Sequence, residues 1–163
     1  MLLEIEPIQQ RGFRNVSRNG QIVGFQVGYR MPYYRGIPLC MSTGVDVKVD
    51  GESFPRDKIT VTIQGRTYTQ EEMKKISNVQ WPNYVAAIFT VAKPGGLQLG
   101  VHDVEVTMTR RVSYFGPGHM PGFGPSPAPG GAGDRAEVSA GERIGRFLYP
   151  AGGTTSRKLV LVR

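Results

Sequence analysis

Two histidines, one cysteine and a few closely spaced acids are the residues of this sequence that could do chemistry. His102 shares strand parity with Val104 and Val106 in an alternating run, so we expect its ring to be a satisfied core residue. His119 lies in a Gly/Pro-rich stretch, and neither histidine belongs to a short metal-ligand spacing such as H-x-x-x-H. Cys40 could act as a nucleophile only beside a base, and a small buried hydrophobe is the simpler interpretation.

Asp103 and Glu105 share one face of the same alternating run, so a pair of cooperating carboxylates is conceivable. The same spacing is typical of a solvated strand. A hydrolase or lyase built on His102 and Asp103 is therefore one hypothesis. The sequence contains no G-x-S-x-G, P-loop or dinucleotide-binding motif. We expect no catalytic residue and no metal ligand in this chain, and no covalent chemistry by the chain alone.

Residues 28–39 are instead the most distinctive stretch. Pro32 and Pro38 fix the backbone and remove two donors, which predicts a stiff, irregular crossing between two strands. Tyr and Arg are enriched at protein interfaces, because they combine wide contact area with hydrogen bonding. The simpler alternative is that the tyrosines cap the core and the arginines lie in water. The aromatic and cationic members of the stretch are Tyr29, Arg30, Tyr33, Tyr34 and Arg35.

The composition indicates which class of partner the chain binds. The 163 residues carry a formal charge of +7, but the bases are scattered and no Lys/Arg-rich run or recognition helix is evident. Arginine supplies most of the bases, which favours fixed bidentate contacts. We therefore expect a protein partner and no nucleic acid. No apolar run is long enough for a membrane span, and acids occupy the N-terminus, so we expect a cytoplasmic protein with no membrane contact.

Alternating patterns predict strands over 21–30, 45–49, 59–63, 84–91, 102–109 and 158–162, with hairpin turns at Asn19-Gly20 and Asp50-Gly51. A capping box from Thr69 to Glu72 begins one short helix that fades near Asn78. Many short strands and one helix predict an all-β fold: an antiparallel, jelly-roll-like β-sandwich. We expect a single domain over 1–163 with a Gly/Pro-rich loop insertion at 116–134.

The loop at 116–134 contains two apolar residues, Met120 and Phe123, which are not typical of a solvent-exposed linker. Its first 16 residues, 116–131, are mostly glycine and proline, so they can form neither helix nor ladder. One interpretation is a mobile tether. The other is an arm that lies on a partner, with Met120 and Phe123 near the mouth of the partner's pocket.

Several motifs of this sequence follow one another in a distinctive order and spacing. The segment RMPYYRGIPL, Arg30 to Leu39, is the most specific of them. The other motifs are Phe13-Arg-Asn-Val16, Gly24-Phe25, Val47-Lys-Val-Asp-Gly51, Tyr68-Thr69, Trp81, Gly95-Gly-Leu97, Gly100, His102 and Ser113-Tyr114. Together they resemble the small (beta) subunit of bacterial C-glycoside deglycosidases, over about 12–115 and the final strand.

The resemblance implies a carbon–carbon lyase that splits the bond between an oxidised, 3-keto sugar and an aromatic aglycone such as a flavonoid. It implies a catalytic alpha subunit, a TIM barrel similar to sugar isomerases, that binds a divalent metal, typically Mn²⁺. The beta subunit is expected to be a non-catalytic β-sandwich beside it, in a higher hetero-oligomer. Tyr33, Tyr34, Arg35 and Arg30 would then contact the alpha subunit. The alternative function is a free-standing carbohydrate- or aromatic-binding sandwich, with the tyrosines stacking on a ring.

Overall fold

The computed structural model describes residues 6–112 and 149–162. By its contacts the chain divides into two units, Met1–Thr109 with Gly152–Arg163, and Arg110–Ala151. The loop predicted at 116–134, with Met120 and Phe123, lies outside the described residues. The prediction of a single domain over 1–163 therefore stays a prediction, and the fold below is that of the first unit.

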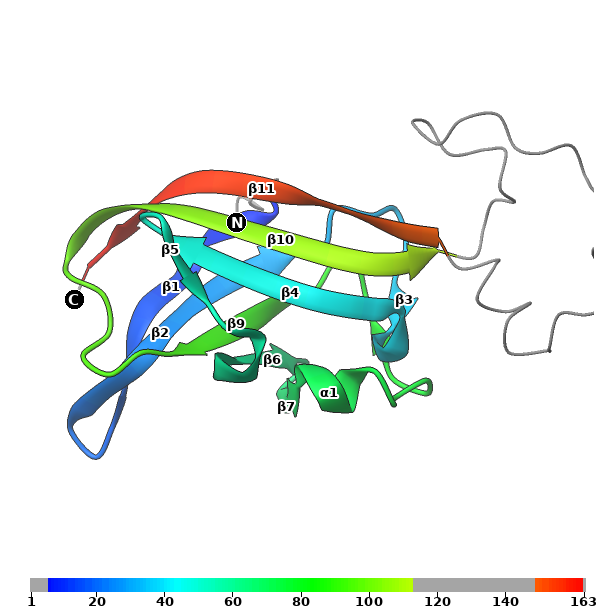
Figure 1. Cartoon of the computed structure of the whole chain (residues 1–163), viewed down its shortest axis with the longest axis horizontal. Helices are drawn as coiled ribbons and strands as arrows, with labels where there is room; N and C mark the ends of the chain where they lie inside the picture. The colour runs from blue at the N-terminus through cyan, green and yellow to red at the C-terminus, as the bar shows by residue number, and fades with distance from the viewer. Residues whose placement is uncertain (1–5, 113–148, 163) are drawn as a thin grey trace, which may run out of the picture. The chain divides into compact units, whose positions relative to one another are not determined.

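The fold is an all-β sandwich of antiparallel sheets, as the alternating patterns predict (Figure 1). A five-stranded sheet has the order β1-β2-β9-β6-β7, a four-stranded sheet the order β11-β10-β4-β5, and β3 pairs with β8 in a small third sheet. The strands are β1 (Ile8–Arg18), β2 (Gln21–Arg30), β3 (Ile37–Pro38), β4 (Ser42–Val49), β5 (Glu52–Phe54), β6 (Ile59–Ile63), β7 (Arg66–Thr69), β8 (Gln80–Trp81), β9 (Ala86–Ala92), β10 (Gly100–Val112) and β11 (Tyr149–Leu161).

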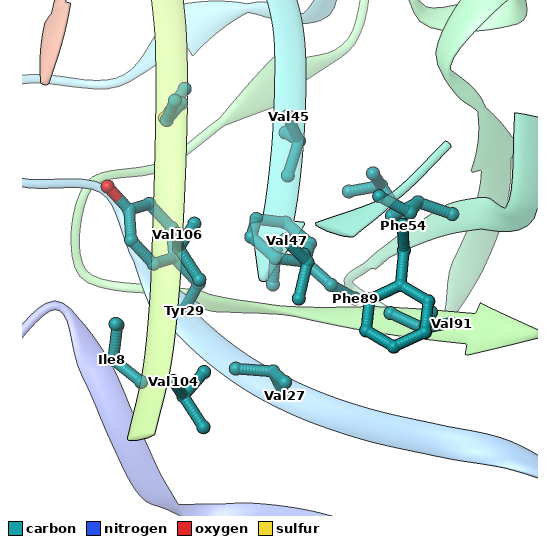
Figure 2. Packing of buried hydrophobic residues seen from close by; sticks show 14 of the residues in the cluster. Ile8, Val27, Tyr29, Val45, Val47, Phe54, Phe89, Val91, Val104 and Val106 are labelled. Carbon is teal, nitrogen blue, oxygen red and sulfur yellow. The ribbon is translucent and has the colours of Figure 1, made fainter. Parts of the chain in front are cut away.

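The core lies between the two larger sheets, because each strand turns its apolar parity inward. Figure 2 shows this packing: Val27 and Phe89 of the first sheet face Val47 and Val106 of the second. All four side chains are essentially inaccessible to solvent. The alternation visible in the sequence is thus the alternation of buried and exposed residues in the strands.

Helical structure is confined to short pieces in the described part of the chain. The α-helix α1 (Gln70–Met73) has the predicted capping box, in which Thr69 accepts from the Glu72 amide and the Glu72 carboxylate accepts from the Thr69 amide. The helix ends after one turn, earlier than the sequence pattern suggested, although Ile76 still packs against the core. Two 3₁₀ turns, η1 (Leu39–Met41) and η2 (Arg56–Lys58), complete the elements. None of the helices among the described residues has the length and apolar character of a membrane span.

Candidate partner-binding site

The stretch after β2 is irregular but firmly held. The Tyr33 amide donates to the Met31 carbonyl at 2.8 Å, closing a tight turn around Pro32. The Asn83 side chain donates to the Tyr33 carbonyl at 3.2 Å. The chain then enters β3, whose Ile37 pairs with Trp81 of β8. The predicted crossing between strands is confirmed, and it is held on one side by the 80–83 segment.

Buried side chains hold this stretch from below. Met31, Ile37, Leu39 and Trp81 are all at most 3% exposed, and the Trp81 indole donates to the Val85 carbonyl at 3.1 Å. Such anchoring lowers the entropic cost of presenting the intervening residues to a partner, because they are already ordered.

Tyr29 does not belong to this surface. Its ring is 1% exposed and stacks on Phe89 with ring centroids 5.3 Å apart. The sequence grouped it with the other tyrosines by proximity. It lies on the inward parity of β2, however, together with Phe25 and Val27, so it is a core residue.

Three other tyrosines form the exposed surface with Arg35. Tyr34 is 63% exposed and Tyr84 78%, while Tyr33 is half-buried. The Tyr33 and Tyr34 rings lie with centroids 4.7 Å apart, and the Arg35 guanidinium carbon is 5.9 Å from the centre of the Tyr34 ring. We call Tyr33, Tyr34, Arg35 and Tyr84 the aromatic surface. Large exposed aromatic rings beside a guanidinium are the side chains that protein interfaces use most.

A shallow hollow of about 280 Å³ adjoins the aromatic surface. Arg30 borders it, and its backbone amide donates to the Pro7 carbonyl at 2.8 Å, which ties the end of β2 to the chain before β1. The four predicted contact residues are therefore close together, with Arg30 less exposed than Arg35. The residues around the hollow are Pro7, Arg30, Met31, Pro32, Tyr33, Asn83 and Tyr84.

Sequence reasoning missed Tyr84 and Asn83, which are about fifty positions away from Tyr33. The pairing of β3 with β8 brings them together. The available signal was Trp81-Pro82: an X-Pro step beside a large apolar residue is typical of an anchored turn. Such a signal does not say which distant segment the turn meets.

The candidates for chemistry lie elsewhere and apart from one another. His102 is buried, its Nδ1 lies 2.6 Å from Asp50 Oδ2, and its Nε2 lies 2.7 Å from the Gln98 carbonyl oxygen. This confirms the expected satisfied core histidine. Because adjacent strand residues point to opposite faces, Asp103 is exposed on the outer face of β10. The structure therefore does not assemble a catalytic pair from His102 and Asp103.

The remaining candidates are ordinary surface groups. Asp103 lies 3.0 Å from Lys158, and Glu105 lies 3.3 Å from Lys48, so each carboxylate has its own lysine. Cys40 is half-buried rather than the buried hydrophobe expected, because it lies in the 3₁₀ turn η1 and not in a strand.

Comparison with known proteins decides the family. The family model for the C-glycoside deglycosidase beta subunit matches residues 3–114. The chain belongs to this family. The C-glycoside deglycosidase beta subunit of Eubacterium cellulosolvens is 39% identical over 116 residues, covering 71% of this chain and 79% of the relative.

Two further relatives of this beta subunit are more distant. The 3'-dehydrocarminate deglycosidase beta subunit of a Microbacterium species is 29% identical over 52% of this chain and 64% of the relative. A C-glycoside deglycosidase beta subunit of Arthrobacter globiformis is 26% identical over 61% of this chain and 73% of the relative. The resemblance carried by the RMPYYRGIPL segment is thus confirmed, and the family's description as a beta subunit implies a partner subunit.

The beta subunit offers no metal centre in the part that the structure describes. Residues 6–112 and 149–162 contain no group of three or more His, Cys, Asp or Glu side chains that could hold an ion. The divalent metal that the resemblance implies does not fit any donor set among them, so no chemical step is assigned to a metal in this subunit.

Proposed function

We propose that this chain is the non-catalytic beta subunit of a C-glycoside deglycosidase, whose alpha subunit carries the metal and performs the cleavage. The observation that carries the proposal is the aromatic surface. It displays side chains suited to binding a protein on a backbone fixed by Asn83 and Trp81. His102 supports it too, because both ring nitrogens of this buried histidine are held by its own chain. A general base needs a nitrogen within reach of substrate.

The proposed reaction is elimination from a 3-keto-C-glycoside with an aromatic aglycone. A ketone at C3 acidifies the hydrogen at C2, and a base removes it. As the C1=C2 double bond forms, the C–C bond breaks, and the aglycone carbon keeps the bonding pair and takes up a proton. The printed name of the Microbacterium relative, a 3'-dehydrocarminate deglycosidase subunit, supports this substrate class. We assign the base to the alpha subunit, proposed to be a sugar-isomerase-like TIM barrel binding Mn²⁺ or a similar ion.

The aromatic surface is proposed as the contact with the alpha subunit. Arg35→Ala and Tyr34→Ala should each weaken the complex by about 2 kcal/mol, roughly 30-fold in Kd, as expected of interface hot spots. Titration of purified alpha subunit with each variant measures this. Arg18→Ala is the matched control, because Arg18 is an exposed arginine at the far end of β1.

Two results would contradict the proposal, and they are distinguishable. Unchanged affinity for both variants would remove the aromatic surface from the interface while leaving the subunit role intact. An alpha subunit that is fully active and stable without this chain would refute the subunit role itself.

The hollow beside Arg30 favours a second candidate, a module that binds a sugar or phenol ring. Tyr33 and Tyr84 could stack on such a ring, although about 280 Å³ is at the small end for a ligand pocket. Calorimetric titration of the isolated full chain with an aromatic C-glycoside tests this. Binding that Tyr84→Ala abolishes would favour the module, whereas the subunit role predicts no detectable heat.

A further inference from the structure

The loop that joins β9 to β10, residues 93–99, is attached to the sandwich at two neighbouring residues (Figure 1). We call this loop the β9–β10 link. The Asn15 side chain donates to the Leu97 carbonyl at 2.8 Å and accepts from the Leu97 amide at 2.9 Å. One residue later, the Gln98 carbonyl oxygen lies 2.7 Å from Nε2 of His102. Of these two attachments, the second depends on a side chain that titrates near neutral pH.

His102 faces an acceptor at each ring nitrogen. Nδ1 lies 2.6 Å from a carboxylate oxygen of Asp50, and Nε2 faces the Gln98 carbonyl. The protonated ring donates to both oxygens, whereas the neutral ring has one N–H and turns a lone pair toward the other oxygen. A lone pair and a carbonyl oxygen at hydrogen-bonding distance repel each other. One of the two contacts therefore has to open when the ring loses its proton.

The contact with Gln98 is the one that opens, because Asp50 is both charged and fixed. The second carboxylate oxygen of Asp50 accepts from the Asp103 amide at 2.8 Å, and the Asp50 amide donates to the Asp103 carbonyl at 2.9 Å. A hydrogen bond to a carboxylate is also stronger than one to a neutral carbonyl. The neutral ring of His102 therefore keeps its proton on Nδ1, toward Asp50.

The β9–β10 link can move at this point. Gly100 has a φ of 139°, which L side chains rarely adopt, and a Cβ there would meet no atom within 4 Å. Leu99 is 55% exposed, so its movement costs little buried surface. Because Asn15 still holds Leu97, the segment that is released is short. It consists of Gln98 and Leu99, between a fixed residue and a glycine hinge.

The elements around the ring supply one charged contact. Asp50, in the turn between β4 and β5, is hydrogen-bonded to the ring. The neighbour on β1 is the uncharged Phe13, which meets the ring edge-on with ring centroids 5.9 Å apart. Lys93 at the start of the β9–β10 link pairs with Glu52 at 2.8 Å. The titration of the ring is therefore governed by Asp50.

Two further charged groups act on Asp50 rather than on the ring. Asp103 and Lys158 pair at 3.0 Å, and both are exposed. Hydrogen bonds from the His102 ring and the Asp103 amide lower the pKa of Asp50, with a smaller contribution from the charge of Lys158. Burial lowers the pKa of His102, but its two hydrogen bonds and the charge of Asp50 raise it above 6.5 on balance. Asp50 thus stays ionised while the ring titrates.

We propose that His102 is a pH-sensitive latch on the β9–β10 link: the protonated ring holds the Gln98 carbonyl, and loss of the proton releases Gln98 and Leu99 to move about Gly100. The link is ordered at acid pH and gains motion as the ring is deprotonated. A partner that contacts the link would meet a preorganised surface only in the protonated state. The latch is a property of this chain by itself, so it does not depend on the proposed function.

Carbon-13 relaxation of the full chain, measured by NMR from about pH 5.5 to about pH 8.5, tests the latch. The Cα–H groups of Gln98 and Leu99 report the motion without exchanging with water. Their order parameters should be about 0.85 at the acid end and below about 0.6 at the alkaline end. The change should have the midpoint of the His102 ring titration, and nitrogen-15 shifts should place the proton of the neutral ring on Nδ1. Leu97 should stay rigid throughout.

Asp50→Asn distinguishes a latch from an ordinary loop. Asn-Gly suits the hairpin turn as well as Asp-Gly does, and the amide oxygen can still accept from the Asp103 amide. Without the carboxylate, the ring loses its proton at a lower pH. The midpoints of the ring titration and of the motion should therefore move down together. Asp57→Asn is the matched control, because it removes the same charge from an exposed residue of η2 and should leave both midpoints unchanged.

Three results would overturn the inference. The first is that the order parameters of Gln98 and Leu99 are the same at the two pH values. The second is that the midpoint of the motion stays in place in Asp50→Asn. The third is a neutral ring protonated on Nε2, because that ring would hold Gln98 and release Asp50.

His102→Gln provides a second test if Asp50→Asn does not fold. The glutamine is uncharged at every pH, so the order parameters of Gln98 and Leu99 should be equal at the acid and alkaline ends. A difference between the two ends as large as that of the wild type would show that another group controls the link.

Discussion

His102 is a buried histidine whose two ring nitrogens both have partners within the chain. The carboxylate of Asp50 and the carbonyl of Gln98 are both acceptors, so both ring nitrogens donate only when the imidazole is protonated. The ring also meets Phe13 edge-on, with ring centroids 5.9 Å apart. Protonated His102 thus joins the β4–β5 turn, the β9–β10 link and β1.

The environment favours the charged ring on balance. Burial lowers the pKa of His102, but the hydrogen bonds to Asp50 and Gln98, together with the charge of Asp50, outweigh it and raise the pKa above 6.5. The hydrogen bonds from the His102 ring and the Asp103 amide lower the pKa of Asp50, and nearby Lys158 acts in the same direction. Asp50 therefore stays ionised throughout the range in which His102 titrates.

Stability should depend on pH through this residue. The pKa of His102 is higher in the folded state than in the unfolded state. The stability that the protonated ring contributes is therefore fully present below about pH 6.5 and is lost as pH rises through the folded-state pKa. We expect the free energy of unfolding of the wild type to exceed that of His102→Gln by more at about pH 5.5 than at about pH 8.5. Urea unfolding at the two pH values measures both.

Asp103→Asn is the control for this pH dependence. The Asp103 carboxylate is exposed on the other face of β10 and pairs with Lys158. The Asp103→Asn variant should therefore keep the wild-type dependence of the free energy of unfolding on pH. A wild-type pH profile identical to that of His102→Gln would show that the histidine is not held in its charged form.

At the scale of elements, tight turns fix the hairpins. Asn19, Asp50 and Gln64 all have positive φ, 52°, 49° and 49°, and each precedes a glycine that also has positive φ. This is the geometry of two-residue hairpin loops. The sequence predicted the first two turns from Asn-Gly and Asp-Gly. It did not signal Gln64-Gly65, because glutamine rarely adopts this conformation and only the pairing of β6 with β7 imposes it.

The one-turn helix α1 contributes a side chain to a sheet. Gln70 is 7% exposed; its side chain accepts from the Val45 amide at 2.9 Å and donates to the Val45 carbonyl at 2.8 Å. The neighbouring strand β5 pairs with β4 only from Val47 to Val49. Gln70 therefore takes the place of a strand beside Val45 and satisfies backbone groups that would otherwise be buried unpaired.

Gln70→Ala removes both hydrogen bonds to the Val45 backbone and should destabilise the fold. Leaving two buried backbone groups without partners costs about 1–3 kcal/mol each, so we expect the free energy of unfolding to fall by about 2–6 kcal/mol. Chemical denaturation measures it. Glu71→Ala changes the next residue of the same turn, an exposed acid that pairs with Lys74 in solvent, and should leave the free energy of unfolding nearly unchanged. Equal losses in the two variants would contradict this role for Gln70.

At the scale of the whole molecule, the aromatic surface depends on the core beneath it. Phe89 is fully buried, stacks on Tyr29 and meets the Trp81 ring edge-on, with centroids 6.2 Å apart. It therefore links the first sheet to the small β3–β8 sheet that supports Tyr34.

Phe89→Ala should destabilise the protein by about 3–5 kcal/mol through loss of burial and the cavity left behind. Calorimetric or urea unfolding measures it, and the folded fraction should also bind the proposed partner subunit less tightly because Trp81 loses its support. Tyr84→Ala is the stability control. This exposed ring should change the free energy of unfolding by no more than about 0.5 kcal/mol. A Phe89→Ala loss as small as that would place the ring outside the structural core.

Particular residues show what sequence patterns can and cannot predict. β2 and β6 were predicted with the observed bounds, because their alternation is strict and turn residues bound them. β1 was missed, because a bulge near Gly12, whose φ is 95°, shifts its register and breaks the alternation. At the site, Tyr34 and Arg35 were predicted as contact residues and are exposed, and Tyr29 has the strand parity of Phe25 and Val27, whereas Tyr84 was missed.

The sequence by itself determined the all-β fold, the hairpins at Asn19-Gly20 and Asp50-Gly51, and the family, because these depend on local periodicity, turn chemistry and motifs. Only the tertiary structure decided which tyrosines face solvent, that His102 contacts Asp50 and Gln98, and that Asn83 contacts Tyr33. Those facts depend on how strands far apart in the sequence pair, and pairing is set by the packing of the whole core rather than by any one segment.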